Sequence, residues 1–281
     1  MILTVLRKPL LIVDGDNLAH RAYHSTPKSV KGEGGRPINA IVGFFSMLSR
    51  VWSEVPARGI FVAWDTLGVD TYRNRLWPPY QGGRIFDPEI VEQINRLPDL
   101  CRPFGFGVGK AAGFEADDIM AAAARSEVAQ GGSALLFTTD RDAYQLVCEE
   151  IFVLAAQRGT RELSRIGPRE VVERMGVLPE QVPDFKALSG DASDKIPGIR
   201  GVGPKAASSL LLRYGTLDRI VEAWGDTEDS KLALTFREVV TMRPEVPVVL
   251  PDGPPDWLRG AAVLREIGAA SLAERISQLS L

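Results

Sequence analysis

The sequence contains few of the residues on which several common kinds of site depend. Cysteine occurs only twice, and Cys101 and Cys148 have neither a paired spacing nor a histidine beside them, so no disulfide or zinc site is predicted. No apolar run reaches the length of about 18 residues that a membrane helix needs. The apolar start of the chain runs into VDGD without a small-residue cleavage site. We therefore expect a cytoplasmic protein with no membrane partner.

The chain also lacks an excess of basic charge. It has 33 lysines and arginines against 36 aspartates and glutamates, a net charge of −3, which on average argues against a nucleic-acid partner. The argument weakens if many acids share one pocket, because the remaining surface is then mildly basic and can bind phosphate. The composition, 45% hydrophobic and 25% charged, is globular and allows one sizeable core and a smaller module.

Three short apolar segments, LLIV, GIFVAW and ALLF, each lead into aspartates, namely Asp14, Asp65, and the pair Asp140 and Asp142. Helical patterns lie between these segments, so the sequence predicts an α/β fold with a largely parallel central sheet flanked by helices. Such folds bind ligands beyond the carboxyl ends of their strands. We expect the four aspartates to face one crevice.

The segment 113–130, GFEADDIMAAAARSEVAQ, places three carboxylates before an alanine-rich run. Glu115, Asp117 and Asp118 lie at the expected positive end of a helix. They could be caps and dipole partners, each stabilising the helix by about 0.3–1 kcal/mol. One carboxylate would suffice for that, and three repel one another unless a cation lies among them, as at a divalent-metal site with oxygen ligands. The segment alone favours neither interpretation.

The segment between Asp65 and this helix interleaves aromatic and basic side chains and is broken by proline and glycine. These side chains are Tyr72, Arg73, Arg75, Trp77, Tyr80 and Arg84. The pattern is typical of a mobile loop that binds single strands, in which bases stack on rings and cations follow phosphates. On composition alone, a polar surface loop is the simpler interpretation.

Strand patterns thin out beyond residue 160, so we expect an α/β domain over 1–160 and a helical subdomain over 161–281. Within the second, the segment 186–214 contains a glycine loop followed by a helix start: Gly198, Gly201, Gly203 and Lys205. Its backbone amides could hold phosphate, although glycine turns between helices are common. Asp191 and Asp194 precede the loop on one helical face, where solvated surface acids are the simple alternative.

Taken in order, these segments resemble the 5′-nuclease or flap endonuclease family, in particular the 5′→3′ exonuclease domain of bacterial DNA polymerase I. The resemblance runs from about residue 10 to beyond residue 217, through VDGDNLAHR, VAWD, TYRNRLWPPYQGGR, GFEADD, TTDRDAYQL and GDASDKIPGIRGVGPKAA. It implies a PIN-like nuclease core with a helical arch at about 69–97, and a helical C-terminal subdomain with a helix-hairpin-helix variant. Because the chain stops at Leu281, we expect a nuclease without a polymerase attached.

The resemblance implies two divalent ions, Mg²⁺ or Mn²⁺, and so favours the metal interpretation of the acids at the helix start. The implied ligands are Asp14, Asp65, Glu115, Asp117, Asp118, Asp140, Asp142, Asp191 and Asp194. The first five would hold one ion and the last three the other, with Asp140 between them or in an outer shell. Such a pair activates water and steadies the leaving oxygen, so His20 and His24 are interpreted as ordinary helix residues. The residues implied in catalysis are Asp14, Asp65, Asp117, Tyr80 and Arg84.

The same resemblance implies contacts with DNA at Arg21, Arg73, Tyr80, Arg84, Gly198, Gly201, Gly203 and Lys205. Tyr80 would stack on an unpaired base and Arg73 would contact phosphate, while the glycine hairpin would grip duplex phosphates and hold a potassium ion. One position departs from the family motif, because Gln81 replaces the lysine that follows the tyrosine. Gln81 can donate a hydrogen bond but cannot neutralise charge. Our hypothesis is slower cleavage, or a cation supplied by Arg84 or Arg75.

The sequence thus predicts a monomeric, metal-dependent 5′→3′ deoxyribonuclease that acts on 5′ flaps, overhangs and single-strand/double-strand junctions in DNA replication and repair. A structure-specific DNA-binding protein with attenuated catalysis is one alternative, which Gln81 favours and the nine mutually repelling acids oppose. A related ribonuclease is another, although the glycine hairpin argues for duplex DNA.

Overall fold

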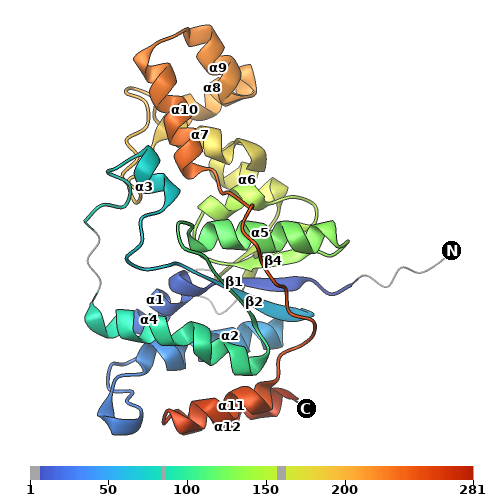
Figure 1. The fold of residues 1–281 in the computed structure, drawn as a ribbon. Coiled ribbons are helices and arrows are strands. Elements are labelled where there is room, and N and C mark those ends of the chain that lie inside the picture. Colours follow the sequence, from blue (N-terminus) through green and yellow to red (C-terminus); the bar gives the residue numbers. More distant parts are fainter. Residues whose placement is uncertain (1–6, 84–86, 157–162, 281) are drawn as a thin grey trace, which may run out of the picture.

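A computed structural model describes residues 7–83, 87–156 and 163–280 (Figure 1). At its centre lies a six-stranded sheet with the order β3-β2-β1-β4-β5-β6, in which β1 to β5 are parallel and β6 is antiparallel to β5. The strands are β1 (Leu10–Asp14), β2 (Gly59–Trp64), β3 (Gly107–Lys110), β4 (Ala134–Phe137), β5 (Ile151–Ala156) and β6 (Leu163–Ile166). The predicted α/β class with a largely parallel sheet is confirmed.

Both faces of the sheet are covered, as the continuous apolar strands require. Side chains alternate along β1, so that Leu10 and Ile12 pack on one face and Leu11 and Val13 on the other. Helix α5 (Ala116–Ala129) lies on the first face, and α1 (Gly15–Ser25), α2 (Asn39–Glu54) and α4 (Pro88–Cys101) lie on the second (Figure 1). This arrangement brings the starts of α1 and α5 to the carboxyl edge of the sheet.

A helical subdomain stands at one end of the sheet, at the top of Figure 1. Its helices are α6 (Pro168–Met175), α7 (Val182–Ser189), α8 (Pro204–Tyr214), α9 (Leu217–Trp224) and α10 (Glu228–Val240). Helix α10 packs against α7 and against α3 (Tyr72–Leu76), the short helix of the expected arch. Single 3₁₀ turns occupy Glu33–Gly35, Arg102–Phe104, Asp142–Leu146, Pro179–Gln181 and Gln278–Ser280.

The division expected at residue 160 differs from the structure at both ends of the second part. Strand β6 extends the central sheet, and helices α11 (Trp257–Glu266) and α12 (Ala270–Ser277) return to the second face of the core. The Trp257 ring packs edge-on against Phe104, with ring centroids 5.6 Å apart. A side chain at Gly260 would come within 2.2 Å of the same phenylalanine ring, so glycine there permits the close approach. Aromatic burial therefore assigns the C-terminal helices to the core.

Among the described residues, no helix combines the length and the apolar composition that crossing a membrane would require.

Candidate metal centre and nucleic-acid interface

The aspartates at the ends of β1 and β2 are held by hydrogen bonds from neighbouring elements. Asp14 caps α1 by accepting the Asn17 amide at 3.0 Å, and its other oxygen accepts the Thr138 hydroxyl at 2.8 Å. Asp65 follows β2, and its Oδ1 accepts the Ala116 amide at the start of α5 at 2.7 Å. These bonds fix two carboxylates where two strands and two helices meet.

Six carboxylates line a cavity of about 350 Å³ at this carboxyl edge. They are Asp14, Asp16, Asp65, Glu115, Asp117 and Asp140. Gln81 and His20 also line this cavity. The expected convergence of strand-end aspartates and the start of α5 on one crevice therefore occurs for Asp14, Asp65, Asp140 and the first two acids of the GFEADD motif.

These carboxyl groups cannot all be ionised at low cost. The pKa of Asp14 is raised to about 7, mainly by burial and also by the charges of Asp65 and Asp140, against the hydrogen bonds from Asn17 and Thr138 that lower it. Burial also raises the pKa of Glu115 to about 7, although the charge of Arg73 opposes the change. The pKa of Asp117 is raised well above its usual value by burial and then by Asp140 and Asp14. A bound cation would reverse this penalty, and hard oxygen donors suit Mg²⁺ or Mn²⁺.

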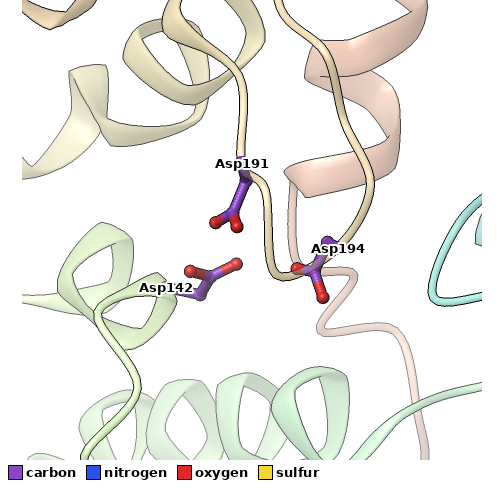
Figure 2. Close-up of side chains that lie close together, drawn as sticks. All are labelled: Asp142, Asp191 and Asp194. Carbon is purple, nitrogen blue, oxygen red and sulfur yellow. The ribbon is translucent and has the colours of Figure 1, made fainter. Parts of the chain in front are cut away.

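A second acidic cluster lies beside the first cavity. Asp142, Asp191 and Asp194 each offer an oxygen within 4.8 Å of the others, and Figure 2 shows Asp142 and Asp191 facing each other with Asp194 beside them. Asp140 lines both the first cavity and a second cavity of about 560 Å³ that contains Asp142 and Asp191. The nine expected acids therefore fall into two neighbouring groups, apart from Asp118.

Lys186 on α7 is a member of the second cluster that none of the sequence motifs indicated. Its buried ammonium pairs with Asp142 and lies 2.6 Å from Asp191 Oδ2. Burial opposes ionisation of Asp191, but hydrogen bonds from Lys186 and Ser193 and the lysine charge lower its pKa overall. The sequence signal that could have suggested the Lys186–Asp191 pair is the lysine near the end of a helix, five residues before the aspartate that follows it.

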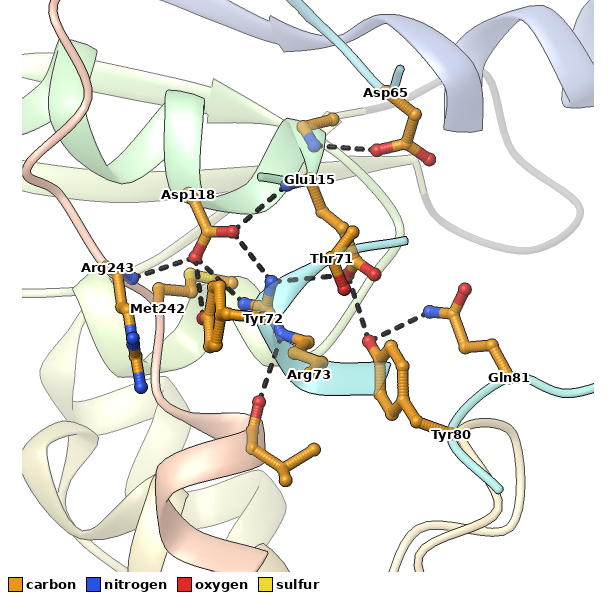
Figure 3. A network of polar contacts seen from close by, with 12 residues as sticks. Asp65, Thr71, Tyr72, Arg73, Tyr80, Gln81, Glu115, Asp118, Met242 and Arg243 are labelled. Atoms are coloured by element: carbon orange, nitrogen blue, oxygen red, sulfur yellow. Dashed lines mark hydrogen bonds and ion pairs between the residues drawn. The ribbon is translucent and has the colours of Figure 1, made fainter. Parts of the chain in front are cut away.

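Asp118 and Arg73 occupy positions different from those expected (Figure 3). Asp118 is fully buried, and its two oxygens accept both terminal nitrogens of Arg73, at 2.6 and 2.9 Å. The same oxygens accept the Tyr72 hydroxyl and the backbone amides of Glu115 and Arg243. Arg73 is 3% exposed and also donates to the Val239 carbonyl. A buried guanidinium needs such partners, so Arg73 faces an internal carboxylate rather than a phosphate, and Asp118 points away from the cavity.

Two family models cover most of the chain. The N-terminal resolvase-like domain of the 5′-3′ exonucleases matches residues 9–176, and their C-terminal SAM fold matches residues 177–250. The chain belongs to the 5′-3′ exonuclease family. This confirms the family expected from the motifs, and the two models meet between α6 and α7 rather than at residue 160.

The relatives of this exonuclease-family chain include much longer proteins. DNA polymerase I of Deinococcus radiodurans is 40% identical over 215 residues, which cover 76% of this chain and 22% of that protein. DNA polymerase I of Bacillus caldotenax is 30% identical over 291 residues, which cover 98% of this chain and 33% of that protein. The chain thus spans about a fifth to a third of the length of these relatives.

Solved structures share the fold of this exonuclease-family chain at low identity. A T5 5′-exonuclease with bound zinc has a TM-score of 0.66 at 22% identity, over 96% of this chain and 97% of that one. Flap endonuclease-1 from Methanococcus jannaschii has a TM-score of 0.59 at 15% identity, over 97% and 93% of the two chains. The PIN-like core and the helical C-terminal subdomain are confirmed.

The family's tyrosine position in the expected arch is buried in this chain. Tyr80 is 5% exposed, and its hydroxyl donates to Glu115 Oε2 at 2.9 Å, so its ring is packed in the core rather than open to an unpaired base. Gln81 adopts a left-handed backbone with φ 47° and donates to the Tyr80 hydroxyl and to Asp194 Oδ1, at 2.9 and 3.1 Å. Gln81 thereby connects Tyr80, the partner of Glu115, with Asp194 of the second cluster. Figure 3 shows the bonds from Gln81 to Tyr80 and from Tyr80 to Glu115. Arg84 lies outside the described residues.

The glycine hairpin lies between α7 and α8. Steric contact explains why its first position, 198, is a glycine. Gly198 has φ 69°, and a side chain there would come within 2.4 Å of the Gly190 amide nitrogen. Gly201, Gly203 and Lys205 are exposed, and Gly203 caps α8 without a side chain over the first turn. Arg21 is exposed on α1. These positions leave backbone amides and two cations open to a phosphate backbone.

Proposed function

We propose that this chain is a divalent-metal-dependent 5′→3′ deoxyribonuclease that cuts DNA at 5′ flaps or degrades it from 5′ ends. The observation that carries the proposal is the cavity with six carboxylates at the carboxyl edge of the sheet, beside a second acidic cluster. Buried carboxylates with raised pKa values suit a cation far better than a neutral ligand. Membership of the exonuclease family supports the same reaction.

The proposed metal ligands divide as the two clusters do. Asp14, Asp65, Glu115 and Asp117 would hold one ion, Asp142, Asp191 and Asp194 the other, and Asp140 lies between. When bound, two Mg²⁺ or Mn²⁺ ions supply an activated water and stabilise the leaving oxygen of an in-line displacement. The protein orients the ligands, through Thr138 and Asn17 on Asp14 and through the Ala116 amide on Asp65. Asp118 would act only by holding Arg73 and the start of α5.

In this proposal Tyr80 and Gln81 act by positioning two of the metal ligands. The Tyr80 hydroxyl orients Glu115, and the Gln81 amide orients Asp194. Gln81 also lines the first cavity, so its amide can donate a hydrogen bond to a phosphate oxygen without supplying charge. A lysine at position 81 would place a positive charge at the cavity wall, where Gln81 offers only a hydrogen-bond donor.

The proposed substrate is DNA with a 5′ flap, a 5′ overhang or a single-strand/double-strand junction. Exposed amides of the glycine hairpin, Lys205 and Arg21 would bind phosphates of the duplex without reading sequence. A potassium ion at the hairpin, a monomeric state, a cytoplasmic location and roles in replication and repair remain predictions that accompany this proposal.

Binding without cleavage is the second candidate, and Gln81 in place of the family lysine is the observation that favours it. Cleavage of a 5′-labelled flap duplex in Mg²⁺, in Mn²⁺ and in EDTA separates the two. We expect metal-dependent cutting near the junction that Asp117→Asn loses, with no cutting of a matched RNA substrate. Tight flap binding without cutting in either metal would support the binding protein, and preferential cutting of RNA would support a ribonuclease.

A further inference from the structure

Asp16 is a buried carboxylate at the acid cavity that no motif assigns. It is the second residue of α1, it is 8% exposed, and it lines the cavity with Asp14 and Asp65. Its Oδ2 accepts the Asp65 amide at 2.7 Å, whereas its Oδ1 has no hydrogen-bond partner among the described residues. A buried carboxylate oxygen without a partner is costly, so it requires an explanation.

Capping of α1 does not supply that explanation. The N-cap role belongs to Asp14, whose Oδ1 accepts the Asn17 amide. The hydrogen bond that Asp16 accepts comes from the Asp65 backbone amide after the end of β2, outside its own helix. Interaction with the positive end of α1 would favour an acid here by about 0.3–1 kcal/mol, but it would be satisfied equally by a carboxylate turned toward water.

Close packing of α1 on β2 forces the Asp16 carboxyl into the cavity wall. A side chain at Gly15 would come within 2.6 Å of the Ala63 carbonyl and of the Trp64 ring, so only glycine lets the helix begin against the end of this strand. The next residue is thereby held beside the Asp65 backbone. Asp16 thus lines the cavity with Oδ2 bonded to the strand end, while its Oδ1 is buried without a hydrogen-bond partner among the described residues.

We propose that Asp16 is a ninth carboxylate of the metal centre, and that its Oδ1 would be an oxygen ligand of the ion that Asp14 and Asp65 would hold. Its Oδ2 meanwhile accepts the Asp65 backbone amide. Asp16 would therefore both bind the ion and position Asp65. The proposal rests on the proposed function only in requiring a divalent ion in this cavity. Six carboxylates around one cavity should bind that ion in the free protein, before DNA arrives.

The test measures Mn²⁺ binding to the whole, DNA-free chain by the electron paramagnetic resonance of unbound Mn²⁺. Asp16→Asn keeps an oxygen that can accept the Asp65 amide but removes the charge, and it should weaken the tighter Mn²⁺ site about 10- to 100-fold. Asp16→Ser, a smaller neutral side chain, should give a loss of similar size. Asp184→Asn is the matched control, because Asp184 is a buried aspartate on α7 that accepts the Leu217 amide and lines neither acid cavity.

Equal Mn²⁺ affinity in Asp16→Asn and wild type would overturn the proposal and leave Asp16 as a positioning residue for Asp65. A loss of equal size in Asp184→Asn would also overturn it, because the effect would then follow from removal of any buried carboxylate. The proposed function is tested separately by wild-type flap cleavage in the same buffer. Wild type that binds Mn²⁺ through Asp16 but leaves the flap intact would support the site and refute the nuclease.

Discussion

Asp117 and Asp118 are adjacent in α5, yet the same substitution should affect them in opposite ways. Asp118→Asn removes the charge from a carboxylate that accepts five hydrogen bonds, two of them from Arg73. The Arg73 guanidinium would keep Glu115, 3.4 Å away, as its nearest anion. Removing one partner of a buried ion pair costs about 3–5 kcal/mol. Because Glu115 remains, we expect the lower end, a loss of about 3 kcal/mol in the free energy of unfolding.

Asp117→Asn should not destabilise the metal-free protein. Burial and the charges of Asp140 and Asp14 raise the pKa of Asp117 well above its usual value, so the ionised form is already disfavoured there. Replacing it with a neutral amide of the same shape removes repulsion within the cavity. The expected free energy of unfolding in EDTA is equal to that of wild type or higher, but the stabilisation by Mg²⁺ should disappear.

Urea unfolding in EDTA and in excess Mg²⁺, followed by tryptophan fluorescence, distinguishes these outcomes. Mg²⁺ at about 100 times its Kd should stabilise the wild type by about 2.7 kcal/mol. Asp118→Asn should have a lower free energy of unfolding than wild type in both conditions and should still be stabilised by Mg²⁺. Asp117→Asn should lose only the stabilisation by Mg²⁺. If Asp118→Asn kept its stability in EDTA and lost the Mg²⁺ gain, Asp118 would be a ligand and the ion-pair reasoning would be refuted.

Three further outcomes follow from the same contacts. Lys186→Met should destabilise the protein in EDTA and increase its affinity for Mn²⁺ in calorimetric titration, because the buried ammonium no longer competes for the second cluster; unchanged affinity would contradict this. Gln81→Lys should raise the single-turnover rate of flap cleavage, and an unchanged rate would show that this position does not limit catalysis. The pKa values of Asp14 and Glu115, raised to about 7, mean that the folded state binds more protons than the unfolded state between about pH 4 and 7. Stability in EDTA should therefore fall as pH rises through this range, and Mg²⁺ affinity should rise, as urea unfolding and calorimetry at several pH values would measure.

The convergence of the strand-end acids could be predicted from sequence because it depends on local patterns. Apolar segments that end in aspartate, with helices between them, leave a parallel sheet as the simplest arrangement, and parallel strands end at one edge. Asp14 and Asp65 meet there for that reason. Strands β3, β5 and β6 were not predicted. Strand β5, IFVLAA, has an apolar run but leads into no aspartate, whereas β3 is GVGK, with two glycines, and β6 is a four-residue strand with an exposed arginine. Neither β3 nor β6 has the apolar run that identified β1, β2 and β4.

The interior of the expected arch could not be predicted, because it depends on contacts between distant parts of the chain. Arg73 donates to the carbonyl of Val239, 166 residues later, and Tyr72 donates to that of Thr241. An interleaving of aromatic and basic side chains is compatible with an exposed strand-binding loop and equally with a buried contact between α3 and α10. Only the packing of α10 decides between them. Tyr72 and Arg73, which donate to the carbonyls of Thr241 and Val239, are thereby removed from solvent.

The GFEADD motif therefore contains residues with two different roles, one at the cavity and one in an internal ion pair, and the sequence of the motif alone does not distinguish them. Successive residues in a helix point about 100° apart, and here Asp117 faces the cavity while Asp118 faces Arg73. That other face meets α3 and the end of α10, where Asp118 accepts Arg73 and the Arg243 amide. Helix α10 in turn packs on α7, which leads into the glycine hairpin. The motif would thus supply the proposed ligands Glu115 and Asp117 on one side of α5, while Asp118 fixes the helical subdomain on the other. Loss of Asp118 should therefore loosen the hairpin relative to the cavity.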